Sequence, residues 1–353
     1  MRILLFSTLS VCMTVSAQES TPSFRMMAFY NVENLFLPNN EEASPDTYVF
    51  NRSSWDEVKY QNKIDAIARV IVSLGNEWGL TGPDILGVAE VENIKVLNDL
   101  KLQSLLSGQT YDVVHFDSPD HRGIDVALLY KRASFIPVRS QRRPLILRLP
   151  EGQIIRSRDV LVVTGYFGPD LIHILVNHWP SRRGGSERSD YLRREAAQLN
   201  RVIIDSISRL YSNPFIITMG DFNDDPTSNS IYNILGGREA GFITPYHNLI
   251  NPMLPLFRKG FGSLAYRDNW HLFDQILMSR PAFSEVQATY TFHQAGIYMP
   301  SWLKTDQGRY KGYPFRTYIG NSYQGGYSDH FPVYLIFKSK ESLGKPDIIR
   351  NPE

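Results

Sequence analysis

Apolar runs of strand length alternate with segments of helical periodicity along the chain, and this alternation constrains its fold more than any other feature. Apolar residues recur at helical spacing over residues 55–74, which Gly75 follows, and a second helix is predicted over residues 188–210. The predicted strands cover residues 24–32, 84–91, 111–116, 126–130, 160–166, 172–177, 215–219, 272–278, 285–292 and 333–337. No repeat is visible, so the pattern predicts a layered α/β protein.

Length and composition exclude several other classes of protein. The 353 residues suit one large domain or two small ones. A hydrophobic content of 42% excludes a chain that is disordered throughout, and the single cysteine, Cys12, excludes a disulfide-stapled scaffold. No apolar run reaches the roughly 18–20 residues that a membrane-spanning helix needs, so the sequence predicts no transmembrane segment.

The first 17 residues are typical of an export signal. Arg2 supplies a positive start, residues 3–15 are mostly apolar, and Val15-Ser16-Ala17 fits a cleavage site. The alternative is a buried N-terminal strand. Cleavage near Ala17 predicts an exported protein, periplasmic or extracellular, whose residues 18–353 form a single domain. Removal of Arg2 would lower the count of Lys and Arg from 37 to 36, against 36 Asp and Glu. Nucleic-acid binding would then have to rest on a local basic patch.

Polar side chains suited to catalysis or metal binding stand at the ends of five predicted strands. These residues are Asn31 and Glu33, Glu90 and Glu92, Asn177 and His178, Asp221 and Asn223, and Asp329 and His330. Because strand ends of a layered α/β protein gather at one rim, we expect these side chains to meet there. The sequence has no GxSxG, GxxxxGKS/T or HExxH motif, and its carboxylate and amide oxygens suit a hard cation such as Mg²⁺.

Seven short motifs occur in order along the chain. They are FYNVENLF at 29–36, GVAEVEN at 87–93, RGIDVALLY at 122–130, VNHWPSR at 176–182, GDFND at 220–224, FDQILMS at 273–279 and YSDHFPV at 327–333. Together they resemble the endonuclease/exonuclease/phosphatase superfamily over residues 27–337, and NVENLF and AEVEN are similar to the versions in secreted bacterial nucleases. The resemblance implies a four-layer α/β sandwich, with two mostly antiparallel or mixed β-sheets packed face to face and helices outside. It also implies phosphoester hydrolysis with Mg²⁺ or Mn²⁺, and Ca²⁺ is a further candidate metal.

The resemblance also implies a set of metal ligands. Glu90 matches the principal metal-binding glutamate, and Asn31 matches the asparagine beside the metal. Asp329 matches the remaining carboxylate near the metal. Glu33 stands where many members carry an aspartate, so it is either a direct ligand or a solvated loop acid.

Five residues match the catalytic positions of the family. The resemblance implies that Asp221 orients or deprotonates the attacking water and that Asn223 donates to a phosphate oxygen. The alternative for this pair is a plain turn motif. His178 and His330 match the two active-site histidines, which donate to the developing charge or protonate a leaving oxygen. Asp274 resembles the carboxylate that holds one of these imidazoles, and the sequence leaves open which one.

Other residues are predicted to contact the substrate or to support the site. Asn177 either buttresses the site or binds phosphate, and Arg122 is a candidate phosphate contact. Arg182 and Arg183 open a basic segment over residues 182–194, which is either an anion-binding patch or a solvated helix start balanced by its own acids. Asp125 replaces the apolar or small residue expected after the glycine of its motif. Residues 38–47 and 294–326 resist assignment, and we expect the second segment to wrap the surface near the site.

Three functions remain open at this point. The first is a secreted nuclease that hydrolyses DNA, or RNA, with nucleic acid as its substrate and no stable protein partner implied. The second is a phosphatase or phosphodiesterase acting on inositol phosphates or phospholipid headgroups. The third is a catalytically inactive binding module on the same scaffold, which the presence of Glu90, Asp221, Asn223 and His330 disfavours.

Overall fold

Two mixed β-sheets make up the centre of the structure, a computed structural model that describes residues 23–38, 55–149, 152–182, 185–242, 244, 248–284 and 286–339. The strands of the first sheet are β1 (Phe24–Leu35), β2 (Ile85–Val91), β3 (Tyr111–His115), β4 (Asp125–Lys131), β16 (Tyr290–Ile297) and β19 (Val333–Ser339). Those of the second are β5 (Phe135–Arg143), β8 (Val160–Phe167), β9 (Asp170–His178), β10 (Phe215–Asp221), β11 (Gly237–Arg238), β12 (Leu249–Ile250) and β15 (Asp274–Ser279).

The helices and the remaining strands surround these sheets. The α-helices are α1 (Glu57–Ser73), α2 (Ile94–Lys101), α3 (Ser186–Leu210) and α4 (Leu254–Arg258). Two-stranded sheets pair β6 (Ile146–Arg148) with β7 (Ile154–Arg156), β13 (Leu264–Tyr266) with β14 (Asn269–His271), and β17 (Tyr318–Ile319) with β18 (Ser322–Tyr323). Short 3₁₀ turns are η2 (Asn76–Trp78), η3 (Ser107–Gln109), η5 (Ala240–Phe242), η6 (Arg280–Phe283) and η7 (Ser301–Leu303), and η4 (Ser230–Leu235) is a π-helix.

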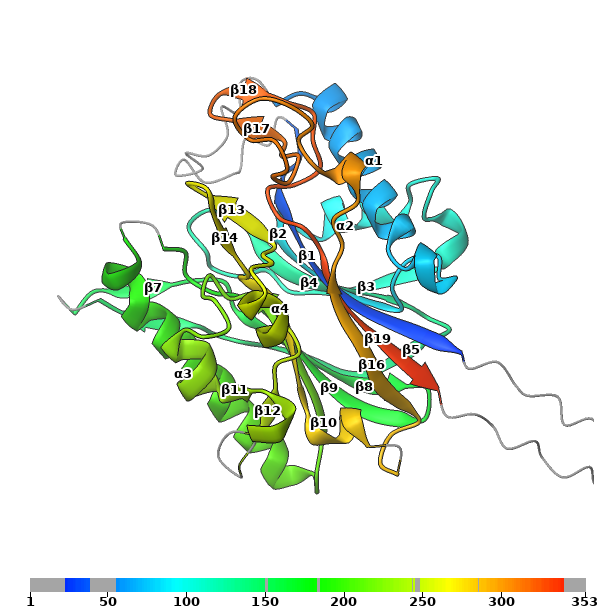
Figure 1. Ribbon diagram of the computed structural model, residues 1–353, viewed down its shortest axis with the longest axis vertical. Coiled ribbons are helices and arrows are strands. Elements are labelled where there is room, and N and C mark those ends of the chain that lie inside the picture. The colour runs from blue at the N-terminus through cyan, green and yellow to red at the C-terminus, as the bar shows by residue number, and fades with distance from the viewer. Residues whose placement is uncertain are drawn as a thin grey trace, which may run out of the picture.

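The order of the strands brings distant parts of the sequence together. Within the described residues, the first sheet runs β16-β19-β1-β2-β4-β3 and the second runs β11-β12-β15-β10-β9-β8-β5. Strands β1 and β2 are parallel, and so are β9 and β10, whereas β15 and β19 run antiparallel to their neighbours β10 and β1. Because β1 pairs with β19, the first and last described strands lie side by side (Figure 1).

The space between the two sheets holds one of the hydrophobic clusters. Met27 and Phe29 of β1 meet Ile217 and Met219 of β10 there, and all four side chains are buried. Gly87 of β2 lies at a point of close approach, since a Cβ atom on it would be 2.6 Å from the sulfur of Met219. A side chain at this motif glycine would push the sheets apart.

Helices cover the outer face of each sheet. Alternate residues of β1 face outward and pack with the apolar stripe of α1, as Ala28 and Ile67 show, and α2 joins the same cluster. On the second sheet, Ile216 of β10 packs with Ala196 and Ile204 of α3. The layers are therefore helix, sheet, sheet and helix, which confirms the predicted four-layer sandwich (Figure 1).

Most predicted elements are found, with shifted ends. The first helix starts at Glu57 because Asp56 caps it by accepting a hydrogen bond from the Lys59 backbone N–H. The strand expected at 285–292 is wrong in its position: β16 starts at Tyr290, where pairing with β19 begins, and a 3₁₀ turn occupies Arg280–Phe283. The sequence analysis missed α2, β5 and the short hairpins. Segment 294–326 contains the end of β16, η7 and the β17–β18 hairpin.

Some predictions fall outside the described residues. They are the export signal at residues 1–17, with its cleavage near Ala17, most of the segment 38–47, and Arg183. The single domain over residues 18–353 also stays a prediction. In the part of the chain that is described, no helix is both long and apolar enough to span a membrane.

Candidate active site

The predicted polar residues gather at one rim, where the two sheets approach each other. In the second sheet, Asp221 at the end of β10 lies in register with His178 at the end of β9 and with Asp274 at the start of β15. In the first sheet, Asn31 of β1 lies beside Ala89 of β2, next to Glu90. The side-chain amide of Asn31 donates to Oδ2 of Asp221 at 3.0 Å, and this hydrogen bond joins the sheets.

Unusual backbone conformations aim several of these side chains. Glu33, Glu90 and Asn223 have φ angles of 52°, 65° and 51°, in the left-handed region that residues other than glycine rarely adopt. At Glu90 the pairing of β2 with both of its neighbours shifts between Ala89 and Val91, as in a β-bulge. Bulges and strained residues are common at functional sites, where they re-aim a side chain.

Asp274 holds His330 and not His178. Nδ1 of His330 lies 2.6 Å from Oδ2 of Asp274, which also accepts a 2.5 Å hydrogen bond from Oγ of Ser263. The other ring nitrogen, Nε2, lies 3.9 Å from Oδ2 of Asp221 and 3.8 Å from Oδ1 of Asp329. Burial alone would lower the pKa of His330, but the three surrounding carboxylates raise it well above its usual value. The three carboxylates therefore favour the protonated form of His330.

His178 has the opposite electrostatic environment. Burial, together with the charges of Arg158 and Arg122, lowers its pKa well below the usual value, which favours the neutral ring. Its Nε2 lies 3.7 Å from Oδ2 of Asp221 and 3.9 Å from Oε1 of Glu90. Within the described residues its buried Nδ1 has no hydrogen-bond partner. The two predicted histidines thus flank Asp221 in opposite electrostatic environments.

Asp221 is the central carboxylate of the site. Its side chain is buried, and Oδ1 accepts a 2.9 Å hydrogen bond from the backbone N–H of Asn223. Burial raises the pKa of Asp221 to about 7, although the positive charge of His330 opposes the shift. A carboxylate with this pKa is suited to accept a proton near neutral pH. Asn223 donates its side-chain amide to the carbonyl oxygen of Trp179 at 3.0 Å.

Glu90 and Asp329 each face an arginine. Oε2 of Glu90 accepts a 3.0 Å hydrogen bond from the backbone N–H of Asn34, and Oε1 lies 3.4 Å from the guanidinium of Arg122. Oδ2 of Asp329 lies 2.7 Å from the guanidinium of Arg316. Arg122, predicted as a phosphate contact, is therefore bound to Glu90 in this structure.

Glu33 is paired with a buried lysine that the sequence analysis missed. Nζ of Lys63, on α1, lies 3.7 Å from Oε2 of Glu33, and the lysine side chain is fully buried. The same Glu33 oxygen accepts a 2.7 Å hydrogen bond from the backbone N–H of Thr317, so it is not a solvated loop acid. Burial and the nearby charge of Asp329 raise the pKa of Glu33 to about 7. One signal for Lys63 existed, since it falls within the apolar stripe of α1 between Tyr60 and Ile67.

The four predicted metal ligands have the donor chemistry of a hard divalent cation, whereas the ligand atoms that lie within 4.8 Å of one another at this rim of the described structure belong to Asp221, Asp274 and His330. Asn31, Glu33, Glu90 and Asp329 offer carboxylate and amide oxygens, which Mg²⁺ and Mn²⁺ prefer in proteins. The raised pKa of Glu33 beside Asp329 reports negative charges close together, which a cation would stabilise. Lys63, Arg122 and Arg316 already offset part of that charge.

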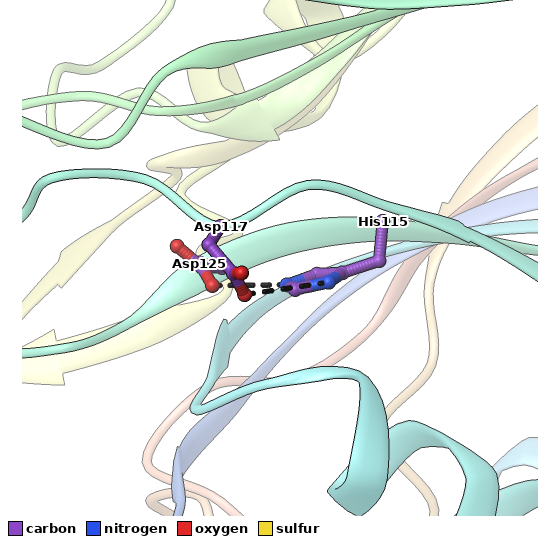
Figure 2. Close-up of side chains that lie close together, drawn as sticks. All are labelled: His115, Asp117 and Asp125. Atoms are coloured by element: carbon purple, nitrogen blue, oxygen red, sulfur yellow. Dashed lines mark hydrogen bonds and ion pairs between the residues drawn. The ribbon is translucent and has the colours of Figure 1, made fainter. Parts of the chain in front are cut away.

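A second group of carboxylates surrounds a histidine at the edge of the first sheet. Figure 2 shows the ring of His115 pointing toward Asp117 and Asp125, and Nε2 of the ring lies 2.9 Å from Oδ2 of Asp125. Oδ1 of Asp125 accepts a 2.8 Å hydrogen bond from the backbone N–H of Ser118. Asp125, which departs from the residue type expected in its motif, therefore holds the loop over residues 116–124 in place. That loop positions the guanidinium of Arg122 beside the carboxylate of Glu90.

Asn177 lies beneath the site and is fully buried. Its amide nitrogen donates to Oγ1 of Thr218 and to the carbonyl oxygen of Met219, and its oxygen accepts from Asn200 and Trp179. With two donors and two acceptor contacts in use, this side chain supports the rim, which fits the buttress alternative and not the predicted phosphate contact. Strand β10 packs tightly against Asn177 at Gly220, since a Cβ atom on that glycine would overlap the backbone carbonyl oxygen of Asn177.

Three arginines of the predicted anion patch at 182–194 form ion pairs in the part of the segment whose side chains are described: Arg182, Arg193 and Arg194. The Arg182 guanidinium donates to the carbonyl oxygen of Asn223 at 2.9 Å and to Asp224 and Asp225 at 3.1 Å each. Arg193 is buried against Asp224, and Arg194 pairs with Asp190 one turn away. Arg182, predicted as a substrate contact, is thus paired with acids in this structure, and its charge orders the loop after Asp221.

Comparison with known proteins agrees with this geometry. The family model described as "Endonuclease/Exonuclease/phosphatase family" matches residues 26–339. No curated protein matches the sequence. Among solved structures, the mannosyl-6-phosphatase of Bacteroides thetaiotaomicron is similar, with 17% identity over 88% of this chain and 98% of that one, and a TM-score of 0.53.

Two eukaryotic structures match to a similar degree. D. rerio TDP2 complexed with single-strand DNA product has 16% identity, covers 89% of this chain and 99% of that chain, and gives a TM-score of 0.52. The human nocturnin catalytic domain with bound sulfate has 18% identity over 90% of this chain and 98% of that chain, and its TM-score is also 0.52. These likenesses show the fold, and the family match spans nearly the whole described chain. The protein belongs to the endonuclease/exonuclease/phosphatase family, whose members are generally hydrolases of phosphoester bonds.

Proposed function

We propose that this chain is a divalent-metal-dependent phosphodiesterase that hydrolyses nucleic acid, DNA or RNA, by attack of an activated water on phosphorus. The observation that carries the proposal is the buried Asp221, which lies between His178 and His330, while Nε2 of the same His178 lies 3.9 Å from Glu90. This arrangement combines a proton acceptor, a fixed positive charge and oxygen ligands within one site.

Each residue has a part in such a reaction. Asp221, oriented by Asn31 and by the Asn223 backbone N–H, accepts a proton from the attacking water. His330, held by Asp274, places its charged Nε2 toward the phosphate, where negative charge develops. His178 contributes a neutral imidazole beside Asp221, which is suited to a hydrogen bond with a phosphoryl oxygen.

The metal ligands would be Asn31, Glu90 and Asp329, with Glu33 as the fourth candidate. Mg²⁺ or Mn²⁺ bound there would polarise a phosphoryl oxygen and offset its charge, and Ca²⁺ is a third candidate. Lys63 keeps Glu33 in place through its 3.7 Å contact, and Arg122 and Arg316 orient Glu90 and Asp329.

A smaller phosphoester is the second candidate substrate. The observation in its favour is the internal pairing of Arg182 and Arg193, which removes part of the basic surface that a polymer would use. A sugar phosphate, as for the similar mannosyl-6-phosphatase, or an inositol phosphate or phospholipid headgroup belongs to this class. The TDP2 structure with single-strand DNA product supports nucleic acid instead. An inactive binding module has no support, since the catalytic set is assembled.

A substrate panel tests the proposal. Single-stranded and double-stranded DNA, RNA, sugar phosphates and inositol phosphates are each incubated with Mg²⁺, Mn²⁺ or Ca²⁺, with a chelator control and the Asp221→Asn protein as the inactive control. We expect metal-dependent cleavage of a nucleic acid. Turnover confined to phosphomonoesters would overturn the nuclease proposal and favour the second candidate. Sequencing the N-terminus of the protein isolated outside the cytoplasm tests the predicted export, which requires a start near residue 18.

A further inference from the structure

A cavity of about 310 Å³ adjoins the active site on the side of Asp329. The β13–β14 hairpin forms one wall, and residues 305–319 form the other, so two segments far apart in the sequence face each other (Figure 1). We propose that this cavity binds one nucleotide of the substrate, next to the phosphate that is cleaved. The inference rests on the proposed function and names the part of the chain that would recognise the substrate.

The position of the cavity makes it an extension of the catalytic site. Asp329 and Arg316 line it, and Oδ1 of Asp329 lies 3.8 Å from Nε2 of His330. A ligand in the cavity would therefore be separated from His330 only by the side chain of Asp329. Ligand pockets in proteins commonly measure about 300–1,000 Å³, so this one holds a single ring system with its sugar and not a length of polymer.

The cavity supplies positive charge that Arg182, Arg193 and Arg194 do not, since these three are paired with acids. Arg267 and Arg309 line it, and within the described part of the chain neither has a carboxylate at ion-pair distance. This contrasts with Arg182, whose guanidinium binds two aspartates. Two guanidinium groups without acidic partners, beside a phosphoesterase site, suit the backbone phosphate that flanks a nucleotide.

Tyrosine rings give the cavity a second kind of contact. Tyr266 and Tyr310 are 59% and 37% exposed, and the guanidinium of Arg309 lies 5.8 Å from the centre of the Tyr310 ring. The Tyr310 and Tyr313 rings lie 5.7 Å apart. Exposed aromatic rings interleaved with arginines are typical of surfaces on which single-stranded bases stack. A base with its phosphate uses both features, and a sugar phosphate has no aromatic face to stack.

The turn of the β13–β14 hairpin has a strained backbone conformation. Arg267 and Asp268 form its two-residue turn with φ angles of 49° and 64°, where Asn and Gly are the usual residues. Tyr313 locks the tip, because its hydroxyl donates to Oδ1 of Asp268 at 2.5 Å and accepts from the Asp268 backbone N–H at 2.8 Å. The cavity walls are therefore tied together, and Arg267 is presented on a rigid turn.

A base-deletion cycle tests the proposal. KM is measured for a single-stranded oligonucleotide and for its counterpart with abasic tetrahydrofuran residues, using the wild type, Tyr310→Ala and Arg309→Ala. We expect Tyr310→Ala to raise KM about tenfold for the normal oligonucleotide, as for loss of one stacking contact, and to leave KM for the abasic one unchanged. Arg309→Ala should raise KM for both. Tyr166→Ala and Arg209→Ala are the matched controls, since both are exposed and Arg209 lies near the opposite end of β10 from Asp221.

The outcomes separate this inference from the proposed function. If the wild type cleaves oligonucleotides but Tyr310→Ala and Arg309→Ala have normal KM values, the cavity assignment is overturned and the nuclease proposal stands. If the wild type cleaves no nucleic acid, the nuclease proposal fails. Calorimetry then measures the binding of thymidine 5′-monophosphate to the Asp221→Asn protein with and without Tyr310→Ala. Binding that is lost when Tyr310→Ala is added supports the cavity assignment. If the nucleotide does not bind, or binds equally well with Tyr310→Ala, the cavity assignment is overturned.

Discussion

Nδ1 of His330 lies 2.6 Å from Oδ2 of Asp274, so the carboxylate at the start of β15 holds the imidazole that precedes β19. This contact links the two sheets across the rim, because β15 belongs to the second sheet and β19 to the first. It also orients the imidazole, since one ring nitrogen is bound and only the other faces Asp221 and Asp329. The arrangement leads to the first prediction.

Asp274→Asn should lower kcat about 10²–10⁴-fold while the fold is retained, because the amide keeps the shape of the carboxylate but no longer stabilises the charged ring. Steady-state kinetics measure the loss, and circular dichroism checks the fold. Ser263→Ala is the graded control, since it removes one hydrogen bond to Asp274 and keeps its charge. A folded Asp274→Asn protein with normal kcat would show that this contact does not matter for catalysis.

Asp221→Asn should abolish hydrolysis in a protein that still folds. The substitution removes the proposed proton acceptor, and a loss of about 10²–10⁴-fold or more is expected for a positioned general base. The rate is measured on the best substrate of the panel, with thermal unfolding as the check on structure. Near-normal turnover would exclude Asp221 as the residue that activates water.

Glu90→Gln should weaken the dependence of activity on Mg²⁺, so that half-maximal activity requires a higher metal concentration. The change removes one negative oxygen ligand and introduces no nitrogen or sulfur ligand, so no preference for Zn²⁺ should appear. Metal titrations of activity for both proteins provide the measurement. Full activity of the wild type in excess chelator would rule out a metal-assisted mechanism.

Arg182→Ala should reduce stability by about 1–3 kcal/mol, because Asp224 and Asp225 each lose a charged hydrogen-bond donor. Arg194→Ala, which breaks an exposed pair with Asp190, should cost only about 0.5 kcal/mol. Urea unfolding compares the two variants. Equal stability, together with a raised KM for DNA in Arg182→Ala, would restore the predicted role of Arg182 in substrate binding.

His173 should make the protein less stable in mild acid. Burial lowers its pKa to about 4 from the ordinary value of 6.5, and Nδ1 lies 2.9 Å from the Thr164 hydroxyl. Because the unfolded chain takes up the proton first, the free energy of unfolding should fall as the pH drops from about 6.5 to 4. His173→Gln should flatten that part of the curve. Identical pH dependence of the two proteins in urea unfolding would contradict the assignment.

The sequence alone predicted most of the longer elements of the fold and the chemical types at its rim. Helical spacing marked the core face of α1, and apolar runs marked β2 and β10, because these signals depend on neighbours within a few residues. The positions of Asp221 and His178 at strand ends followed from the same local pattern. The order of the motifs then indicated the family, since order along the chain needs no knowledge of contacts.

Only the tertiary structure decided which side chains meet. The pairing of Asp274 with His330, the capture of Arg182 by two aspartates and the burial of Lys63 beside Glu33 each join residues from separate elements. Such contacts depend on strand order, register and bulges, which local periodicity does not specify. The cavity between the β13–β14 hairpin and residues 305–319 is the clearest case, because neither segment carries a strong periodic pattern and their contact exists only in the folded chain.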